Sequence, residues 1–251
     1  GDVPASGVAL PRGRLVFADQ EGGLVKAFPD LPPAQPASAY TTAGEAFAAG
    51  KETGAALQRA GVDVDLAPVL DSSDGPLGSR QFRRQTFGVA FLRGLLAAGA
   101  ASCVKHFPGL GTAPVSTDED PHVHARVRRS ELAGFRWAIR AGAPCVMVNH
   151  AFYKPFGRRR ASLETGTYRL LRHLGFRGVA MTDSLDVAGS SHAVPWAKRA
   201  IRAGADLLLV TNPSDARRVV DALVPLARQG LLDDAVARVL ELRHAKGLPR
   251  P

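Results

Sequence analysis

Short runs of apolar, mostly β-branched residues alternate with longer amphipathic stretches along almost the whole chain, and this alternation restricts the fold most. The apolar runs predict strands at 15–18, 62–67, 101–105, 145–149, 178–182 and 206–210. The amphipathic stretches predict helices at 43–59, 82–98, 130–140, 165–173, 194–202, 214–228 and 233–245. Strands that alternate with helices are typical of a parallel sheet covered by helices, so the sequence predicts an α/β fold.

The number of strand–helix units is lower than a complete barrel requires. Six units are recognisable, whereas a closed (β/α)8 barrel has eight. The segment 1–13 is too short for two further units of ~30 residues each. We therefore expect a TIM-type barrel that is incomplete at its N-terminus, in a single domain over residues 1–251.

Polar residues gather directly after these strands. A lone aspartate there is usually a turn or cap residue, but polar residues follow all six strands. Since parallel α/β folds place their chemistry at the carboxyl ends of strands, we expect a functional site at this edge. The residues concerned are Asp19 and Glu21, Asp71, Lys105 and His106, Asn149 and His150, Asp183, and Thr211 and Asn212.

The chain is basic, with a formal net charge of +9, and arginines cluster at 83–84, 128–129 and 158–160. Aromatic residues make up only 6% and do not follow these clusters, whereas nucleic-acid surfaces combine both. We interpret the arginines as solvated helix faces and expect no nucleic-acid partner. The charge is also compatible with attraction to an anionic polymer such as a cell-wall glycan. No run approaches the ~18 apolar residues of a transmembrane segment, and no signal peptide is recognisable at Gly1.

The two cysteines, Cys103 and Cys145, lie in predicted strands. We expect two buried free thiols, with a disulfide between neighbouring strands as the alternative. The redox compartment is therefore left open.

Five segments together carry a resemblance to a known family. They are Ala-Asp-Gln-Glu-Gly-Gly (18–23), Val-Asp-Leu-Ala-Pro-Val-Leu-Asp (64–71), Lys-His-Phe-Pro-Gly (105–109), Val-Met-Val-Asn-His-Ala (146–151) and Gly-Val-Ala-Met-Thr-Asp-Ser-Leu (178–185). In these segments, and in their order, the chain resembles glycoside hydrolase family 3, specifically its single-domain β-N-acetylglucosaminidase-like branch. The family has about two strand–helix units before the first segment, which agrees with the low number of units found here.

The resemblance implies a retaining glycosidase in which Asp183 is the nucleophile that attacks the anomeric carbon and forms a covalent glycosyl intermediate. The alternative for Asp183 is an N-cap of the following helix. Lys105 and His106 match contacts to sugar hydroxyls, which these side chains suit as hydrogen-bonding groups. Asp19 matches the acidic residue that binds hydroxyls at the non-reducing end.

Further positions match less closely. His150 corresponds to a polar residue near the floor of the substrate site, with a structural histidine as the alternative. The arginine expected after the second strand is either Arg80 or Arg84, because the stretch 78–88 fits the family pattern only loosely.

One loop departs from the pattern of the branch. Relatives usually read KHFPGHG followed by Asp-Ser-His, whose histidine is the general acid/base; here Leu110 and Ser116-Thr117-Asp118 take those places. Asp118 is the first candidate for the acid/base, given an environment that raises its pKa, and His122 is the second. The alternative is that residues 118–124 form only a solvated acidic loop.

The resemblance implies an exo-glycosidase that acts on β-linked N-acetylglucosamine or a related β-glycoside, in peptidoglycan turnover, with no metal or cofactor. The altered loop and the short N-terminus favour an alternative: a catalytically impaired glycan-binding pseudoenzyme of the same fold. A phosphorylase that uses the same nucleophile is a third hypothesis. Sugar specificity and oligomeric state stay open. Location also stays open, since family relatives occur in the cytoplasm and at the bacterial envelope.

Overall fold

The computed structural model describes residues 13–72 and 74–248. Six strands form one parallel sheet, in which each strand pairs with the next one along the chain. Across the sheet they are β1 (Phe17–Ala18), β4 (Val64–Asp65), β5 (Ala101–Phe107), β6 (Cys145–Val148), β7 (Val179–Ser184) and β8 (Leu207–Leu209). Each overlaps a predicted run. The six-unit α/β fold is therefore confirmed, and most of the segment 1–13 lies outside the described residues.

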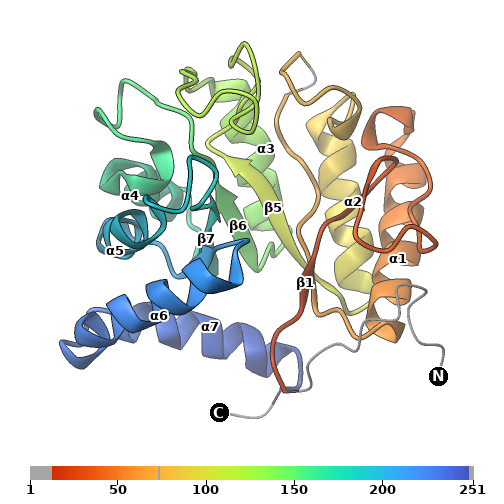
Figure 1. Cartoon of the computed structure of the whole chain (residues 1–251). Coiled ribbons are helices and arrows are strands. Elements are labelled where there is room, and N and C mark those ends of the chain that lie inside the picture. The colour runs from red at the N-terminus through yellow and green to blue at the C-terminus, as the bar shows by residue number, and fades with distance from the viewer. Residues whose placement is uncertain (1–12, 73, 249–251) are drawn as a thin grey trace.

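Helices cover the outer face of the sheet and lie close to their predicted bounds. Figure 1 shows α1 and α2 on one flank, α4 and α5 on the other, and the loops that follow the strands at the upper end. The helices are α1 (Ala43–Arg59), α2 (Gln85–Ala97), α3 (Arg129–Arg140), α4 (Thr165–His173), α5 (Ala193–Ala203), α6 (Pro213–Arg228) and α7 (Asp233–Ala245).

Local signals explain where some of these helices begin. Thr42 and Glu45 form a reciprocal capping box at the start of α1, which satisfies backbone N–H groups that have no partner within the helix. Asn212 caps α6 through the Ser214 N–H, and Pro213 stands in the first turn, where its missing N–H costs nothing.

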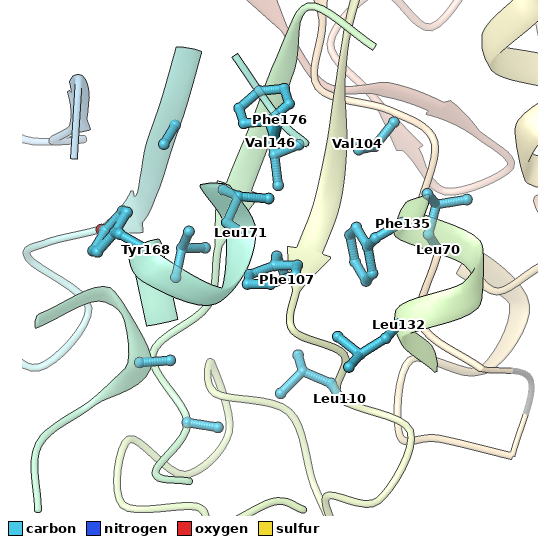
Figure 2. Close-up of a cluster of buried hydrophobic side chains, with 14 of the residues drawn as sticks. Leu70, Val104, Phe107, Leu110, Leu132, Phe135, Val146, Tyr168, Leu171 and Phe176 are labelled. Atoms are coloured by element: carbon cyan, nitrogen blue, oxygen red, sulfur yellow. The ribbon is translucent and has the colours of Figure 1, made fainter. Parts of the chain in front are cut away.

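The two faces of the sheet pack against different partners because side chains alternate along each strand. Val104, Val146 and Ala180 point outward and join a large cluster with residues of the covering helices. Figure 2 shows this cluster, in which Phe107 and Phe135 meet edge to face with ring centroids 5.2 Å apart. The outer face therefore anchors the helices, and the inner face is left for a second cluster.

The inner, concave face is lined by Leu15, Phe17, Val179 and Met181 among others, and α7 contributes Val239 and Leu242 to it. No strand pairing joins β1 to β8 in the described part of the chain, so the sheet stays open there. The expected incomplete barrel is confirmed as a curled half-barrel, and α7 lies across its open lower side (Figure 1).

The cysteines differ from the expectation. Cys103 of β5 and Cys145 of β6 form a disulfide, with Cα atoms 4.2 Å apart, so the expectation of two free thiols is wrong and the alternative is right. The parallel register places the two residues directly opposite each other, and both are fully buried on the concave face. Sequence periodicity locates strands but leaves their register open, which is why the pairing was not evident.

Within the described residues, no helix combines the length and the apolar character needed to cross a bilayer.

Candidate active site

Strand alternation directs three of the predicted site residues toward the mouth of the half-barrel. Lys105 has the parity of Ala101 and Cys103, and Asp183 has the parity of Val179 and Met181, all of which line the concave face. Asp19 follows Phe17 with the same spacing. The three side chains therefore converge at the carboxyl ends of β5, β7 and β1.

These residues line one cleft of about 300 Å³ at the carboxyl ends of the strands. It is walled by the segment 116–118, by Leu77 and Leu110, by the last residues of β7 and β8, and by Thr211. The polar members of its lining are Asp19, Arg80, Lys105, His106, Ser116, Thr117, Asp118, Asp183, Ser184 and Thr211. Predicted residues from distant parts of the sequence are thus brought together.

A tight hairpin after β1 shapes one side of the cleft. The alternation did not predict the antiparallel strands β2 (Gln20–Gly22) and β3 (Val25–Lys26). The chain turns between them at Gly22 and Gly23, whose φ angles are 108° and 58°. Only glycine adopts such angles readily, and a Cβ at either position would collide with the segment 35–36. The turn places the Glu21 side chain in the interior beside Lys105.

Lys105 is the centre of a buried ion-pair network. Its Nζ lies 2.5 Å from Asp19 Oδ1 and 2.6 Å from Glu21 Oε1, and Arg80 binds both oxygens of Glu21 at 2.8 Å. Burial alone would lower the pKa of Lys105, but the carboxylates of Glu21 and Asp19 outweigh it and raise the pKa. Burial raises the pKa of Glu21, yet Lys105 and Arg80 bring it down to about 2. Glu21, Lys105 and Arg80 are therefore charged at neutral pH.

Asp71 orients the imidazole of His106. Its Oδ2 accepts from the His106 backbone N–H at 3.2 Å and lies 2.7 Å from the ring Nδ1, while its Oδ1 accepts from the Leu110 N–H at 2.7 Å. A carboxylate at Nδ1 fixes the ring and leaves Nε2 for the cleft that His106 lines. Asp71 therefore holds both the ring and the loop that follows it.

Asp183 stands at the carboxyl end of β7, ten residues before α5 begins at Ala193, so it is not the N-cap of that helix. Its Oδ1 accepts from the Ser184 N–H at 2.8 Å. Burial opposes ionisation of Asp183, but the imidazoles of His106 and His150, this N–H and the Lys105 ammonium together lower its pKa. The carboxylate is therefore ionised and able to act as a nucleophile.

The His150 ring contacts the last residue of β7. Its Nε2 lies 2.8 Å from the Ser184 carbonyl and its Nδ1 lies 2.6 Å from Ser162 Oγ. Burial lowers the pKa of His150, so the ring is neutral, and Nε2 must carry the proton because a carbonyl only accepts. His150 is not among the residues that line the cleft.

One of the two acid/base candidates and one of the two arginine candidates line the cleft, and the other two do not. Asp118 and Arg80 line the cleft. His122 projects away with 80% of its side chain exposed, beside Asp120, and Arg84 is an exposed residue at the start of α2. Neither His122 nor Arg84 belongs to the lining of the cleft. Both candidates came from sequence proximity to a motif, which does not determine the direction of a loop side chain.

Several residues that organise the site received no role from the sequence. Glu21 and Asp71 were noted only as polar residues after strands, and Glu131, in the first turn of α3, was not singled out. Glu131 accepts from the backbone N–H groups of Ser72 and Gly111 and joins the loops after β4 and β5. A glutamate within an amphipathic helix gives no sequence signal that it will be buried.

Other features of the described residues are less suited to chemistry. A larger hollow of about 420 Å³ lies between α4, α5 and α7. Its Arg172 and Arg238 are both paired with Asp206, at 2.5 Å and 2.9 Å, so these charges are already engaged. No group of three His, Cys, Asp or Glu side chains in residues 13–72 and 74–248 could hold a metal ion.

Curated relatives share most of this chain. A protein named beta-hexosaminidase from Stenotrophomonas maltophilia (strain K279a) is 36% identical over 231 residues, which are 82% of this chain and 69% of that protein. A beta-hexosaminidase from Bordetella pertussis (strain Tohama I) is 33% identical over 240 residues, covering 83% of this chain and 67% of that protein.

Solved structures of similar fold carry names of the same class as these curated relatives. A glycoside hydrolase family 3 beta-N-acetylglucosaminidase from a Paenibacillus species superposes with a TM-score of 0.83 at 29% identity, over 94% of this chain and 51% of that chain. A beta-N-acetylhexosaminidase from Beutenbergia cavernae gives a TM-score of 0.82 at 30% identity, over 93% of this chain and 78% of that chain. This chain thus spans about half the length of the Paenibacillus protein.

A parallel half-barrel whose strand-end cleft is lined by an ionised carboxylate and a Lys-His pair, together with these likenesses, indicates the glycoside hydrolase class. Residues 7–242 match the model of the Glycosyl hydrolase family 3 N terminal domain. The chain belongs to glycosyl hydrolase family 3, which confirms the resemblance inferred from its five motifs.

Proposed function

We propose that this chain is a retaining exo-glycosidase that hydrolyses β-linked N-acetylglucosamine or a related β-glycoside through a covalent intermediate on Asp183. The names of the curated and structural relatives support the sugar class. The single observation that carries the mechanism is that Asp183, with a lowered pKa, shares a cleft with Lys105, His106, Asp19 and Arg80. Peptidoglycan fragments fit this substrate class.

In this mechanism Asp19 of the ion-pair network and His106 bind sugar hydroxyls while Asp183 attacks the anomeric carbon. Asp19 keeps 48% of its side chain exposed although it is paired with Lys105, so it has lone pairs left for sugar hydroxyls. His106, fixed by Asp71, offers Nε2 as a second contact. Groups already held in place lose little entropy when the substrate binds, which favours a productive orientation.

The proton for the leaving oxygen comes from Asp118. In the first step the Asp183 carboxylate bonds to the anomeric carbon as the glycosidic bond breaks, and Asp118 protonates the departing oxygen. In the second step the Asp118 carboxylate takes a proton from water, the water oxygen bonds to the anomeric carbon, and Asp183 is released. Its position in the cleft lining favours Asp118 over His122.

The nucleophile is tested with Asp183→Asn, which keeps the shape of the side chain but removes its charge. We expect hydrolysis of dinitrophenyl N-acetyl-β-glucosaminide to fall by roughly 10³-fold or more, as when a group of a catalytic unit is lost. Mass spectrometry of the wild-type chain with a slow fluorinated substrate should show a glycosyl adduct on Asp183. Undiminished turnover by the variant would refute the proposal.

The acid/base is tested with Asp118→Ala. Because a dinitrophenolate leaves without a proton, kcat/KM for the dinitrophenyl glycoside, which reports the first step, should persist, while kcat/KM for the phenyl glycoside or for chitobiose falls by about 10²- to 10⁴-fold. The matched control is His122→Ala, which should leave both rates unchanged. Saturable binding of chitobiose by the wild-type chain without turnover would instead identify a glycan-binding pseudoenzyme, and dependence of turnover on phosphate would identify a phosphorylase.

A further inference from the structure

Arg160 is a buried arginine that lies just outside the cleft. It has only 5% of its surface exposed. Its guanidinium carbon lies 4.6 Å from the centroid of the Trp196 ring and 5.0 Å from that of Phe152, so two aromatic side chains flank the cation. Its Nη1 donates to the carbonyls of Pro121 and His150.

No carboxylate in residues 13–72 and 74–248 forms an ion pair with Arg160. A buried cation without such a partner costs free energy unless other groups replace its hydration. Here two carbonyls and the aromatic rings do so, and a planar guanidinium suits stacking and forked donation together. We therefore infer the role of Arg160 from the groups that its guanidinium contacts.

The Pro121 carbonyl belongs to the loop of Asp118. Thr112 and Arg126 close the neck of this loop, because Thr112 Oγ1 accepts from the Arg126 N–H at 2.6 Å. Just inside this neck, Phe152 exchanges backbone hydrogen bonds of 2.9 Å with residues 123 and 125. Arg160 binds the loop nearer its tip than either contact, three residues after Asp118.

The other contacts of Arg160 lead to the turn that carries Asp183. The His150 carbonyl accepts from Arg160 at 3.3 Å, and the ring of the same histidine lies 2.8 Å from the Ser184 carbonyl. Trp196 is in the first turns of α5, the helix that follows this turn, and its ring packs on the His150 ring with centroids 5.6 Å apart. The guanidinium therefore contacts the loop of Asp118 directly and reaches the Asp183 turn through His150 and Trp196.

We propose that Arg160 is a positioning residue that holds the loop of Asp118 at a fixed place relative to the Asp183 turn. This inference rests on the proposed function, since it assigns the acid/base to that loop. Without the guanidinium, the loop keeps its neck but loses the contact at Pro121, so Asp118 is misplaced while Asp183 and the sugar contacts stay in position.

The test uses Arg160→Met and Arg160→Lys in the full chain, with phenyl and dinitrophenyl N-acetyl-β-glucosaminides as substrates. We expect Arg160→Met to lower kcat/KM for the phenyl glycoside by about 10²-fold, the usual effect of misplacing a catalytic group by about 1 Å. For the dinitrophenyl glycoside, kcat/KM should change less than threefold, because its first step needs no proton from Asp118. Arg160→Lys should lie between, since lysine supplies the charge without the planar fork. The matched control is Arg159→Met, a neighbour whose side chain is 55% exposed.

A merely structural role predicts equal losses on both substrates, and that result would overturn the proposal, as would no loss on either. If Arg160→Met does not fold, the same comparison is made with Arg160→Lys and Trp196→Leu, each of which removes part of the contact. Equal losses of kcat/KM on the two substrates in these variants likewise overturn it.

A double variant separates this inference from the proposed function. If Asp118 is the acid, Arg160→Met should add no further loss on the phenyl glycoside when Asp118 is already alanine. Additive losses would show that Arg160 does not act through Asp118 and would refute the inference. Failure of the proposed function has another signature, full activity of Asp183→Asn on both substrates.

Discussion

At the scale of single residues, Glu131 organises the site from outside it. Its Oε1 accepts from Ser72 Oγ at 2.8 Å and from the Gly111 N–H at 2.7 Å, and the residue is fully buried. A Cβ at Gly109 or at Gly111 would collide with this carboxyl group, so both glycines are needed beside it. The loop after His106 is therefore held by a side chain from α3.

Glu131 should make stability depend on pH. Burial and the nearby Asp71 carboxylate raise its pKa from 4.5 to about 6. A carboxyl group with a raised folded-state pKa contributes fully below its unfolded pKa, and that contribution of about 2 kcal/mol is lost as the pH rises through 6. Glu131→Gln cannot ionise. Relative to the wild type, its free energy of unfolding in urea should therefore rise by about 2 kcal/mol between pH 3.5 and 7.5.

The control for this prediction is Glu119→Gln, a change at an exposed carboxyl group. The pH dependence of its stability is measured beside that of Glu131→Gln. A difference between Glu131→Gln and the wild type that does not change with pH would contradict the role given to Glu131.

At the scale of elements, α1 and α2 pack at unusually short range through glycines. A Cβ at Gly50 of α1 would collide with the Phe91 carbonyl of α2, and one at Gly94 of α2 would collide with the Phe47 carbonyl of α1. Glycine is a poor helix former, but here it allows two backbones to meet. This pair of helices covers the strands that precede the Lys-His segment.

Gly50→Ala should therefore destabilise the protein. The overpacking costs about 1–3 kcal/mol and exceeds the gain of up to about 1 kcal/mol from the better helix propensity of alanine. Gly44→Ala is the matched control in the same helix, since the nearest atom to its added Cβ is Thr42 Oγ1 at 3.9 Å. Thermal unfolding should show a lower Tm for the first variant and an equal or higher Tm for the second. The reverse order would contradict this packing.

At the scale of the whole molecule, two features bind the half-barrel together across long stretches of sequence. The Cys103–Cys145 disulfide joins β5 to β6 over 42 residues. Leu242 of α7, near the end of the described chain, packs with Val64 and Phe17 on the concave face. The open sheet is thus closed on its inner side by a helix rather than by further strands.

Replacing both cysteines by alanine should lower the free energy of unfolding by about 2–4 kcal/mol, the typical contribution of a native disulfide. Activity at low temperature should persist, because neither sulfur lines the cleft. Urea unfolding of the double variant and of the wild type measures the loss. Thiol titration of the denatured, unreduced wild type should detect no free thiol, and two titratable thiols would contradict the disulfide.

The order of strands and helices was accessible from the sequence because periodicity is local. A run such as Ala101–Phe107 or an amphipathic stretch such as Ala43–Arg59 carries its own signal, and the capping pair Thr42 and Glu45 marks a boundary within four residues. The same argument placed Lys105 and Asp183 at strand ends. Alternation from their strand neighbours then directs both to the concave face.

By itself, then, the sequence determined the α/β half-barrel, the edge that carries the polar residues and membership of the family, since each depends on local pattern or motif. The tertiary structure alone decided which charges meet. Glu21 pairs with Arg80 across 59 positions, and Cys103 bonds to Cys145 across two strands. Asp118 and Arg80 line the cleft, whereas His122 and Arg84 do not. Such contacts depend on strand register and loop direction, and these are set by packing between elements that are distant in the chain.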